Sequence, residues 1–169
     1  GVHARSAIPA LIQTLAEGKV DRKRVAYSIA YTGDEGIGVL CELIECIYLH
    51  RNIDYGQDHS TSSLNKVTKQ RLKQRIQRGG VQVKVNAIYG LEKINEDTSK
   101  HLGRVITTLY RATSYPTPAI RAASVKMLGK FYLRTVTGNN DSSNITPYLV
   151  RLPDHINSLL SDKDINVRK

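Results

Sequence analysis

Four short stretches of the sequence match one another: RKRVA at 22–26, VKVNA at 83–87, IRAAS at 120–124 and VRK at 167–169. The second position of each stretch is basic, namely Lys23, Lys84, Arg121 and Arg168. In the first three stretches a small residue follows three positions later, and an apolar or small residue follows four positions after that. This spacing keeps to one face of an α-helix. Recurrence of one such pattern along a chain is the signature of a repeat architecture.

Apolar residues around these stretches recur at intervals of three and four, which is the period of an amphipathic helix. The first helix is expected to have Pro9 in its first turn and to end at Gly18. Further helices are expected at 22–31, 37–49, 64–78, 81–94 and 98–112, from 116 or 118 onward, from 146 and from 164. Polar stretches at 52–63 and 137–144 are expected to be loops. No β-alternation longer than about four residues occurs, so the sequence predicts an all-α fold.

Each predicted helix has one face that is expected to be buried. These faces consist of Ile8, Leu11, Ile12 and Leu15; Val25, Ala26, Ile29 and Ala30; Ile37, Leu40, Cys41, Ile44, Ile47 and Tyr48; Val83, Ala87, Ile88 and Leu91; Leu102, Val105, Ile106 and Leu109; and Ile120, Ala123, Ser124, Met127, Leu128 and Phe131. Because the chain has one Phe and no Trp, its core must be built mainly from aliphatic side chains. Such side chains suit closely packed helices.

The pairing of these helices resembles the HEAT and armadillo repeat families. In those families an outer helix, often with an early proline, is followed by an inner helix that opens with Val-Arg and a small residue. The closest matches are Ile8-Pro9-Ala10-Leu11 and the segment from Leu159 to Arg168. The resemblance implies a right-handed α-solenoid of stacked antiparallel helix pairs, with about 3.5 to 4 repeats. It also implies a single repeat domain over 1–169 that is a fragment of a longer solenoid, because a helix pair needs neighbours to bury its apolar face.

The repeat departs from a regular HEAT array in two respects. The four basic anchors are 61, 37 and 47 residues apart, and we interpret the first interval as an insertion made of the 52–63 loop and the helix at 64–78. The turn before the anchor has an Asp, common in the family, only at Asp21 and Asp164. A continuous ladder of Asp–Arg pairs is therefore not expected.

The net charge of +10 is concentrated in two blocks without acidic residues. Residues 59–91 contain seven Lys or Arg and no Asp or Glu, and residues 98–140 contain another seven and no acid. Within these blocks, basic residues form helical stripes at Lys66, Lys69 and Lys73, at Arg71, Arg75 and Arg78, and at Lys126, Lys130 and Arg134. Like charges four residues apart on a helix repel one another. A polyanionic partner would offset that repulsion.

The charge pattern leads to a protein partner as the first hypothesis. We expect a non-catalytic scaffold that binds an acidic segment of another protein through a basic surface. The alternative is binding to the nucleic-acid backbone without sequence preference, and a solvated basic face with no partner is a third interpretation. The candidate contact residues are Lys66, Lys69, Lys73, Arg75, Arg78, Lys84, Arg121, Lys126, Lys130 and Arg134.

Motifs for catalysis or metal binding are not found in the sequence. The segment Gly33-Asp-Glu-Gly-Ile-Gly38 lacks both the preceding strand and the Lys-Ser/Thr of a phosphate loop, and is expected to be a turn between helices. The five His and two Cys show no metal-ligand spacing, so no metal and no cofactor is expected. Two enzyme classes resemble this fold, the helical-repeat DNA glycosylases and the phycobilin lyases. The glycosylases use Trp and acidic residues in a basic face, and this chain has no Trp.

The remaining features concern the compartment. No stretch approaches the ~18 apolar residues that a membrane span requires, and the first residues have no signal-peptide core. Cys41 and Cys46 are five residues apart, which turns them to different sides of a helix, and two single thiols favour a reducing compartment. The sequence therefore predicts an intracellular protein, in the cytoplasm or nucleus, with no membrane contact.

Overall fold

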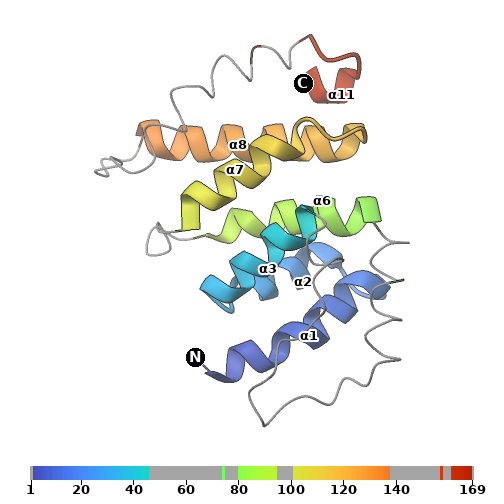
Figure 1. The fold of residues 1–169 in the computed structure, drawn as a ribbon, viewed down its shortest axis with the longest axis vertical. Helices are drawn as coiled ribbons and strands as arrows, with labels where there is room; N and C mark the ends of the chain where they lie inside the picture. Colours follow the sequence, from blue (N-terminus) through green and yellow to red (C-terminus); the bar gives the residue numbers. More distant parts are fainter. Residues whose placement is uncertain are drawn as a thin grey trace. The chain divides into compact units, whose positions relative to one another are not determined.

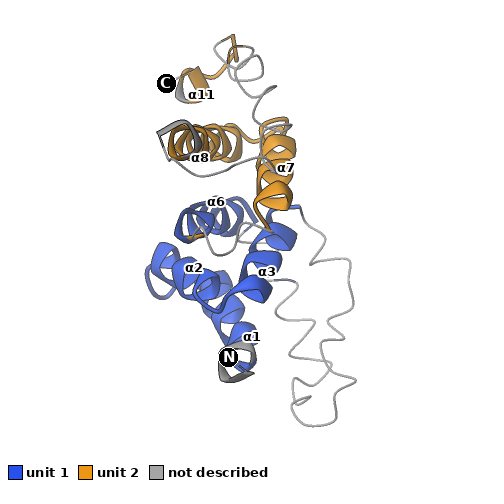
Figure 2. Cartoon of the chain, turned by 90° about the vertical axis from the view of Figure 1, so that its left-hand side faces the viewer, with its two compact units in different colours: residues 1–93 blue, residues 94–169 orange. Residues whose placement is uncertain are grey.

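The computed structural model describes residues 2–45, 74, 80–94, 101–137, 157 and 161–168. Regular structure in these ranges is helical and contains no strand, which confirms the all-α prediction. The chain divides into two compact units, residues 1–93 and residues 94–169 (Figure 2). The predicted loop at 52–63 and most of the predicted helices at 64–78 and from 146 lie outside the described residues. Of the loop predicted at 137–144 only Thr137 is described, and it is the last residue of a helix.

The first unit contains α1 (Val2–Glu17), α2 (Arg22–Ala30), α3 (Asp34–Ile44) and α6 (Gly80–Gly90), which leads into the 3-10 turn η1 (Leu91–Lys93). Helix α2 packs against α1, α3 and α6, and α3 also packs against α6 (Figure 1). The first helix pair, α1 with α2, thus packs against the second pair, α3 with α6. The contact between the pairs is made mainly by α2, which touches both α3 and α6.

Short polar and glycine signals separate these helices. Gly18 ends α1 with a φ of 66°, a left-handed conformation that glycine adopts at little cost. Asp21 caps α2, because its carboxylate accepts hydrogen bonds from the backbone N–H groups of Lys23 and Arg24 at 2.9 and 3.4 Å. Gly33, with a φ of 89°, precedes α3. The segment 33–38 was expected to be a turn between helices, but only Gly33 belongs to the turn and residues 34–38 belong to α3.

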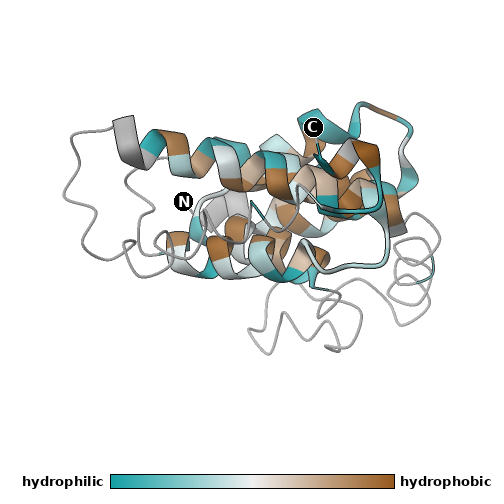
Figure 3. Ribbon diagram, turned by 90° about the horizontal axis from the view of Figure 1, so that it is seen from above, coloured by the Kyte–Doolittle hydropathy of each residue, from teal (hydrophilic) through white to brown (hydrophobic). Residues whose placement is uncertain are grey.

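The core of the first unit consists of the residues that the helical period assigns to it. Every predicted inward residue of α2 and α6 is buried, as are the described ones of α3, and in α1 only Leu11 is partly exposed. The largest fully buried side chains of this unit are Ile12, Leu15, Ile29, Ile37, Leu40, Ile44, Ile88 and Leu91. Burying one such side chain contributes about 1.5–3 kcal/mol. Figure 3 shows apolar and polar positions alternating along the helices, as this arrangement requires.

Two helix boundaries differ from the prediction. Helix α1 begins at Val2, so Pro9 lies in the interior of the helix and the prediction that it occupies the first turn is wrong. Proline ends many helices but is tolerated where packing holds the chain in place, and Ile8 and Ile12 on either side of Pro9 are buried. Helix α3 begins at Asp34, three residues before the expected start, because Asp34 and Glu35 favour the positive end of the helix dipole.

The second unit contains α7 (Leu102–Ala112), α8 (Pro118–Thr137) and the short α11 (Ile165–Arg168). Helix α8 packs against α7 and against α11 (Figure 1). The predicted inward residues of α8 are all buried, and in α7 only Leu102 is partly exposed. Helix α8 starts at a proline, as expected.

Candidate partner-binding surface

The basic row of α8 is accessible to solvent. Lys126 and Arg134 are exposed and Lys130 is partly exposed, whereas Met127, Leu128 and Phe131 are buried. The guanidinium of Arg134 lies 5.9 Å from the centre of the Phe131 ring, a distance that permits a cation–π contact. The structure thus places these three predicted contact residues along one stripe, which we call the α8 row.

The α7–α8 pair contains further positive charge. Residues 101–137 include no Asp or Glu. Helix α7, packed against α8, has two exposed arginines, Arg104 and Arg111. The α7–α8 pair therefore has no acidic side chain of its own to neutralise the row.

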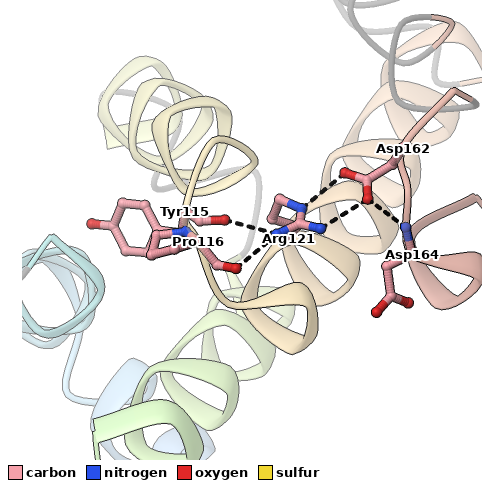
Figure 4. A network of polar contacts seen from close by, with 5 residues as sticks. All are labelled: Tyr115, Pro116, Arg121, Asp162 and Asp164. Carbon is pink, nitrogen blue, oxygen red and sulfur yellow. Dashed lines mark hydrogen bonds and ion pairs between the residues drawn. The ribbon is translucent and has the colours of Figure 1, made fainter.

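Arg121 belongs to the same block but has a different role. Its residue exposure is only 6%. Its Nε and Nη2 donate to the two carboxylate oxygens of Asp162 at 2.9 and 2.8 Å, and its Nη1 donates to the backbone oxygens of Tyr115 and Pro116 at 3.0 Å each (Figure 4). The guanidinium is thus used inside the unit. The prediction that Arg121 contacts an anionic partner is not retained, because this group is buried and already bonded to a carboxylate.

Asp162 completes this buried network. Its Oδ1 also accepts a hydrogen bond of 2.8 Å from the backbone N–H of Asp164, in the turn before α11. The bonds from Arg121, and then the one from Asp164, hold the pKa of Asp162 below its ordinary value, while the bond to Asp162 raises the pKa of Arg121. The pair holds the start of α11 against α8, so it is a structural ion pair.

The other predicted contact residues belong to the first unit or lie outside the described residues. Lys84 lies on α6, in the first unit, and is partly exposed. The remaining ones, Lys66, Lys69, Lys73, Arg75 and Arg78, lie outside the described residues. The structure therefore places three of the predicted residues on one surface, all of them on α8.

A second group of polar side chains was not predicted. On α2, the Lys23 ammonium lies 5.6 Å from the centre of the Tyr27 ring and 5.4 Å from that of Tyr89 on α6. The Lys93 ammonium lies 4.9 Å from the Tyr27 ring, and the Tyr27 hydroxyl donates to Glu92 at 3.1 Å. We call these five residues the α2–η1 cluster.

Spacing in the sequence offers a signal for this cluster. Lys23 and Tyr27, like Tyr89 and Lys93, are four residues apart and so share a helix face. Hydrogen bonding to Tyr27 is the main cause of a raised pKa for Lys23, with the charge of Glu92 as a smaller cause. Because Glu92 offsets part of the lysine charge, the cluster is better suited to joining α2 to η1 than to attracting a polyanion.

Three features of the described part of the chain concern metal binding, thiols and membrane contact. No group of three or more His, Cys, Asp or Glu in these ranges could hold a metal ion. Cys41 is fully buried in α3, and Cys46 lies outside the described residues. Of the described helices, none is both long and apolar enough to cross a membrane.

Comparisons with known proteins leave the family open. No family model matches the sequence, no curated protein is similar to it, and no solved structure matches the fold.

Proposed function

We propose that this chain is a non-catalytic helical-repeat scaffold of the HEAT type, which binds an acidic segment of a partner protein through the α8 row. The observation that carries the proposal is the exposed row Lys126, Lys130 and Arg134 in a stretch without acidic residues. Three cations on one face, four residues apart, repel one another in the free protein. An acidic partner removes that repulsion and gains up to three ion pairs.

The HEAT part of the proposal is a right-handed solenoid with about 3.5 to 4 repeats. It is supported by the pairs α1 with α2, α3 with α6 and α7 with α8, whose second helices contain the three full copies of the matching stretch. It is also supported by Arg121, the basic anchor of α8, which bonds to the turn before α11. In such an array the anchor of one repeat holds the next repeat in place.

Binding to the nucleic-acid backbone is the second candidate, because an acid-free basic row also suits phosphates. The two candidates differ in what they require. A phosphate backbone needs charge alone, whereas a protein segment can also use apolar side chains beside the row. The test therefore compares both kinds of polyanion directly.

The experiment is fluorescence anisotropy with labelled poly-glutamate, duplex DNA, single-stranded DNA and RNA, each at two salt concentrations. We expect poly-glutamate to bind and Lys126→Glu/Lys130→Glu to weaken binding by at least about tenfold, which corresponds to about 1.4 kcal/mol. The control for net charge is Lys19→Glu/Arg24→Glu, which changes the charge equally at two exposed residues of the first unit, each of which is paired with a surface carboxylate, that of Glu17 or Asp21.

Each outcome decides between the candidates. Steeply salt-dependent binding of nucleic acid with no binding of poly-glutamate favours the second candidate. Equal loss of binding in the control pair would mean that net charge, and not the α8 row, governs the interaction. Absence of binding to every polyanion at low salt rejects the basic-surface proposal.

A further inference from the structure

We infer that α8 docks an acidic amphipathic helix whose carboxylates and apolar side chains each repeat every four residues. This inference rests on the proposed function and specifies the kind of partner. It is carried by a second row on α8, which runs beside the basic one. Val125, Gly129 and Leu133 each precede one residue of the α8 row, so they are also four residues apart. We call them the apolar row.

The apolar row is accessible. Leu133 is 61% exposed, one of the most exposed large apolar side chains in the described part of the chain. Val125 and Gly129 are partly exposed. A Cβ atom added at Gly129 would meet no other atom within 4 Å, so the surface is open between Val125 and Leu133. The row is therefore open to contact from outside the helix.

The two rows together have the pattern of an amphipathic docking surface. Positions four apart on a helix differ by about 40° in direction, and adjacent positions by about 100°. Lys126 and Leu133 are seven residues apart, so they point in nearly the same direction. Leu133 thus lies along the edge of the basic stripe and is not on the opposite side of the helix.

The spacing favours a helix as the partner. Helix α8 runs unbroken from Pro118 to Thr137, and its rise places the first and last members of each row about 12 Å apart. A second helix with acidic side chains at i, i+4 and i+8 has the same repeat and can face the whole row. A phosphate backbone matches the charge but has no apolar group for Leu133. Recognition of a helix by such anchors is a common mode of protein–protein binding.

The test uses two labelled synthetic peptides of identical composition. One has Glu and Leu in adjacent rows four residues apart, and the other has the same residues in scrambled order, which gives no apolar row. Binding to the intact chain is measured by anisotropy, and helix formation by circular dichroism. We expect the patterned peptide to bind at least about tenfold more tightly and to gain helicity on binding.

Two variants of the chain distinguish the contribution of each row. Leu133→Ser removes an exposed apolar group and should reduce binding of the patterned peptide several-fold, with little effect on poly-glutamate. Lys126→Glu/Lys130→Glu should weaken binding of both. The variants are compared by circular dichroism with the unaltered chain, and exposed positions are chosen so that folding is preserved.

The results separate this inference from the proposed function. If the scrambled peptide binds as tightly as the patterned one, or Leu133→Ser has no effect, the amphipathic-helix partner is refuted while the acidic partner stands. If neither peptide nor poly-glutamate binds, the proposed function fails as well. Tighter binding of duplex DNA than of the patterned peptide would also overturn the inference.

Discussion

The close approach of α2 and α6 can be tested with one added carbon atom. Gly90 ends α6, and a Cβ atom there would lie 2.9 Å from the backbone oxygen of Ala26, 3.0 Å from a methyl of Leu40 and 3.1 Å from the Ala26 Cβ. The Leu40 methyl can move aside, but the backbone oxygen of α2 cannot move unless the helices separate. Gly90→Ala should therefore push apart the two helices that contain the first two copies of the repeat.

The expected size of the effect follows from two opposing terms. Overpacking a well-filled contact typically costs 1–3 kcal/mol. Alanine favours a helix over glycine by about 0.5–1 kcal/mol in the interior and by less at the last residue. Gly90→Ala should therefore destabilise the first unit by about 1–2 kcal/mol. Gly129→Ala is the matched control, because Gly129 lies inside α8 and its added Cβ meets nothing within 4 Å. That variant should stabilise by about 0.5–1 kcal/mol.

The measurement is urea denaturation followed by helix content at 222 nm, with the midpoint and slope compared for the three proteins. Opposite shifts of the midpoint are expected for the two variants. If Gly90→Ala is as stable as the unaltered chain or more stable, the helices do not meet as closely as Ala26 and Gly90 indicate. The stacking of α2 on α6 would then need a different geometry.

Two further predictions concern the polar networks. Arg121→Met should lower the melting temperature of the second unit by roughly 5–10 °C, because it leaves the partly buried Asp162 carboxylate without its partner. The folded pKa of Asp162 lies below its ordinary value of 3.8, so the stabilisation by the ion pair is present above pH 3.8 and is lost as the pH falls through the lowered pKa. The difference in stability between Arg121→Met and the unaltered chain should therefore shrink in acid. An unchanged difference in acid would argue against the ion pair. Tyr27→Phe removes the hydroxyl that bonds to Glu92 and should lower the pKa of Lys23 toward 10.5. The measurement is an NMR titration of the lysine side-chain carbons. An unchanged pKa of Lys23 would mean that the Tyr27 hydroxyl contributes nothing to it.

Much of the fold could be predicted from local patterns. The period of apolar residues predicted the buried faces of α2, α6 and α8, because an amphipathic helix in a folded unit must bury its apolar face. Gly18 and Gly33 were both expected near helix ends, and both have positive φ. The start of α1 was missed because proline is a common first-turn residue, whereas Pro9 lies inside the helix between the buried residues Ile8 and Ile12.

The α2–η1 cluster was harder to predict because its members come from helices distant in sequence. Tyr27 and Glu92 are 65 residues apart, and nothing in either segment indicates that they meet. Each lysine–tyrosine pair is visible as a four-residue spacing, but the contact between the pairs depends on α2 packing against α6. Tertiary packing, and not local preference, brings such groups together.

The separation of Arg121 from Lys126 is the step on which the functional reasoning depends. Both are basic residues of α8 in one acid-free block, and a count of charges treats them alike. Their registers differ: Arg121 lies three residues before Ser124 and seven before Leu128, so it falls on the face already predicted to be buried. A buried guanidinium requires a carboxylate partner, and the acid-free block contains none, so the partner had to come from a distant segment such as the turn at Asp162. Lys126 and Arg134 are exposed and Lys130 is partly exposed, so these three charges, unlike that of Arg121, can be reached from solvent.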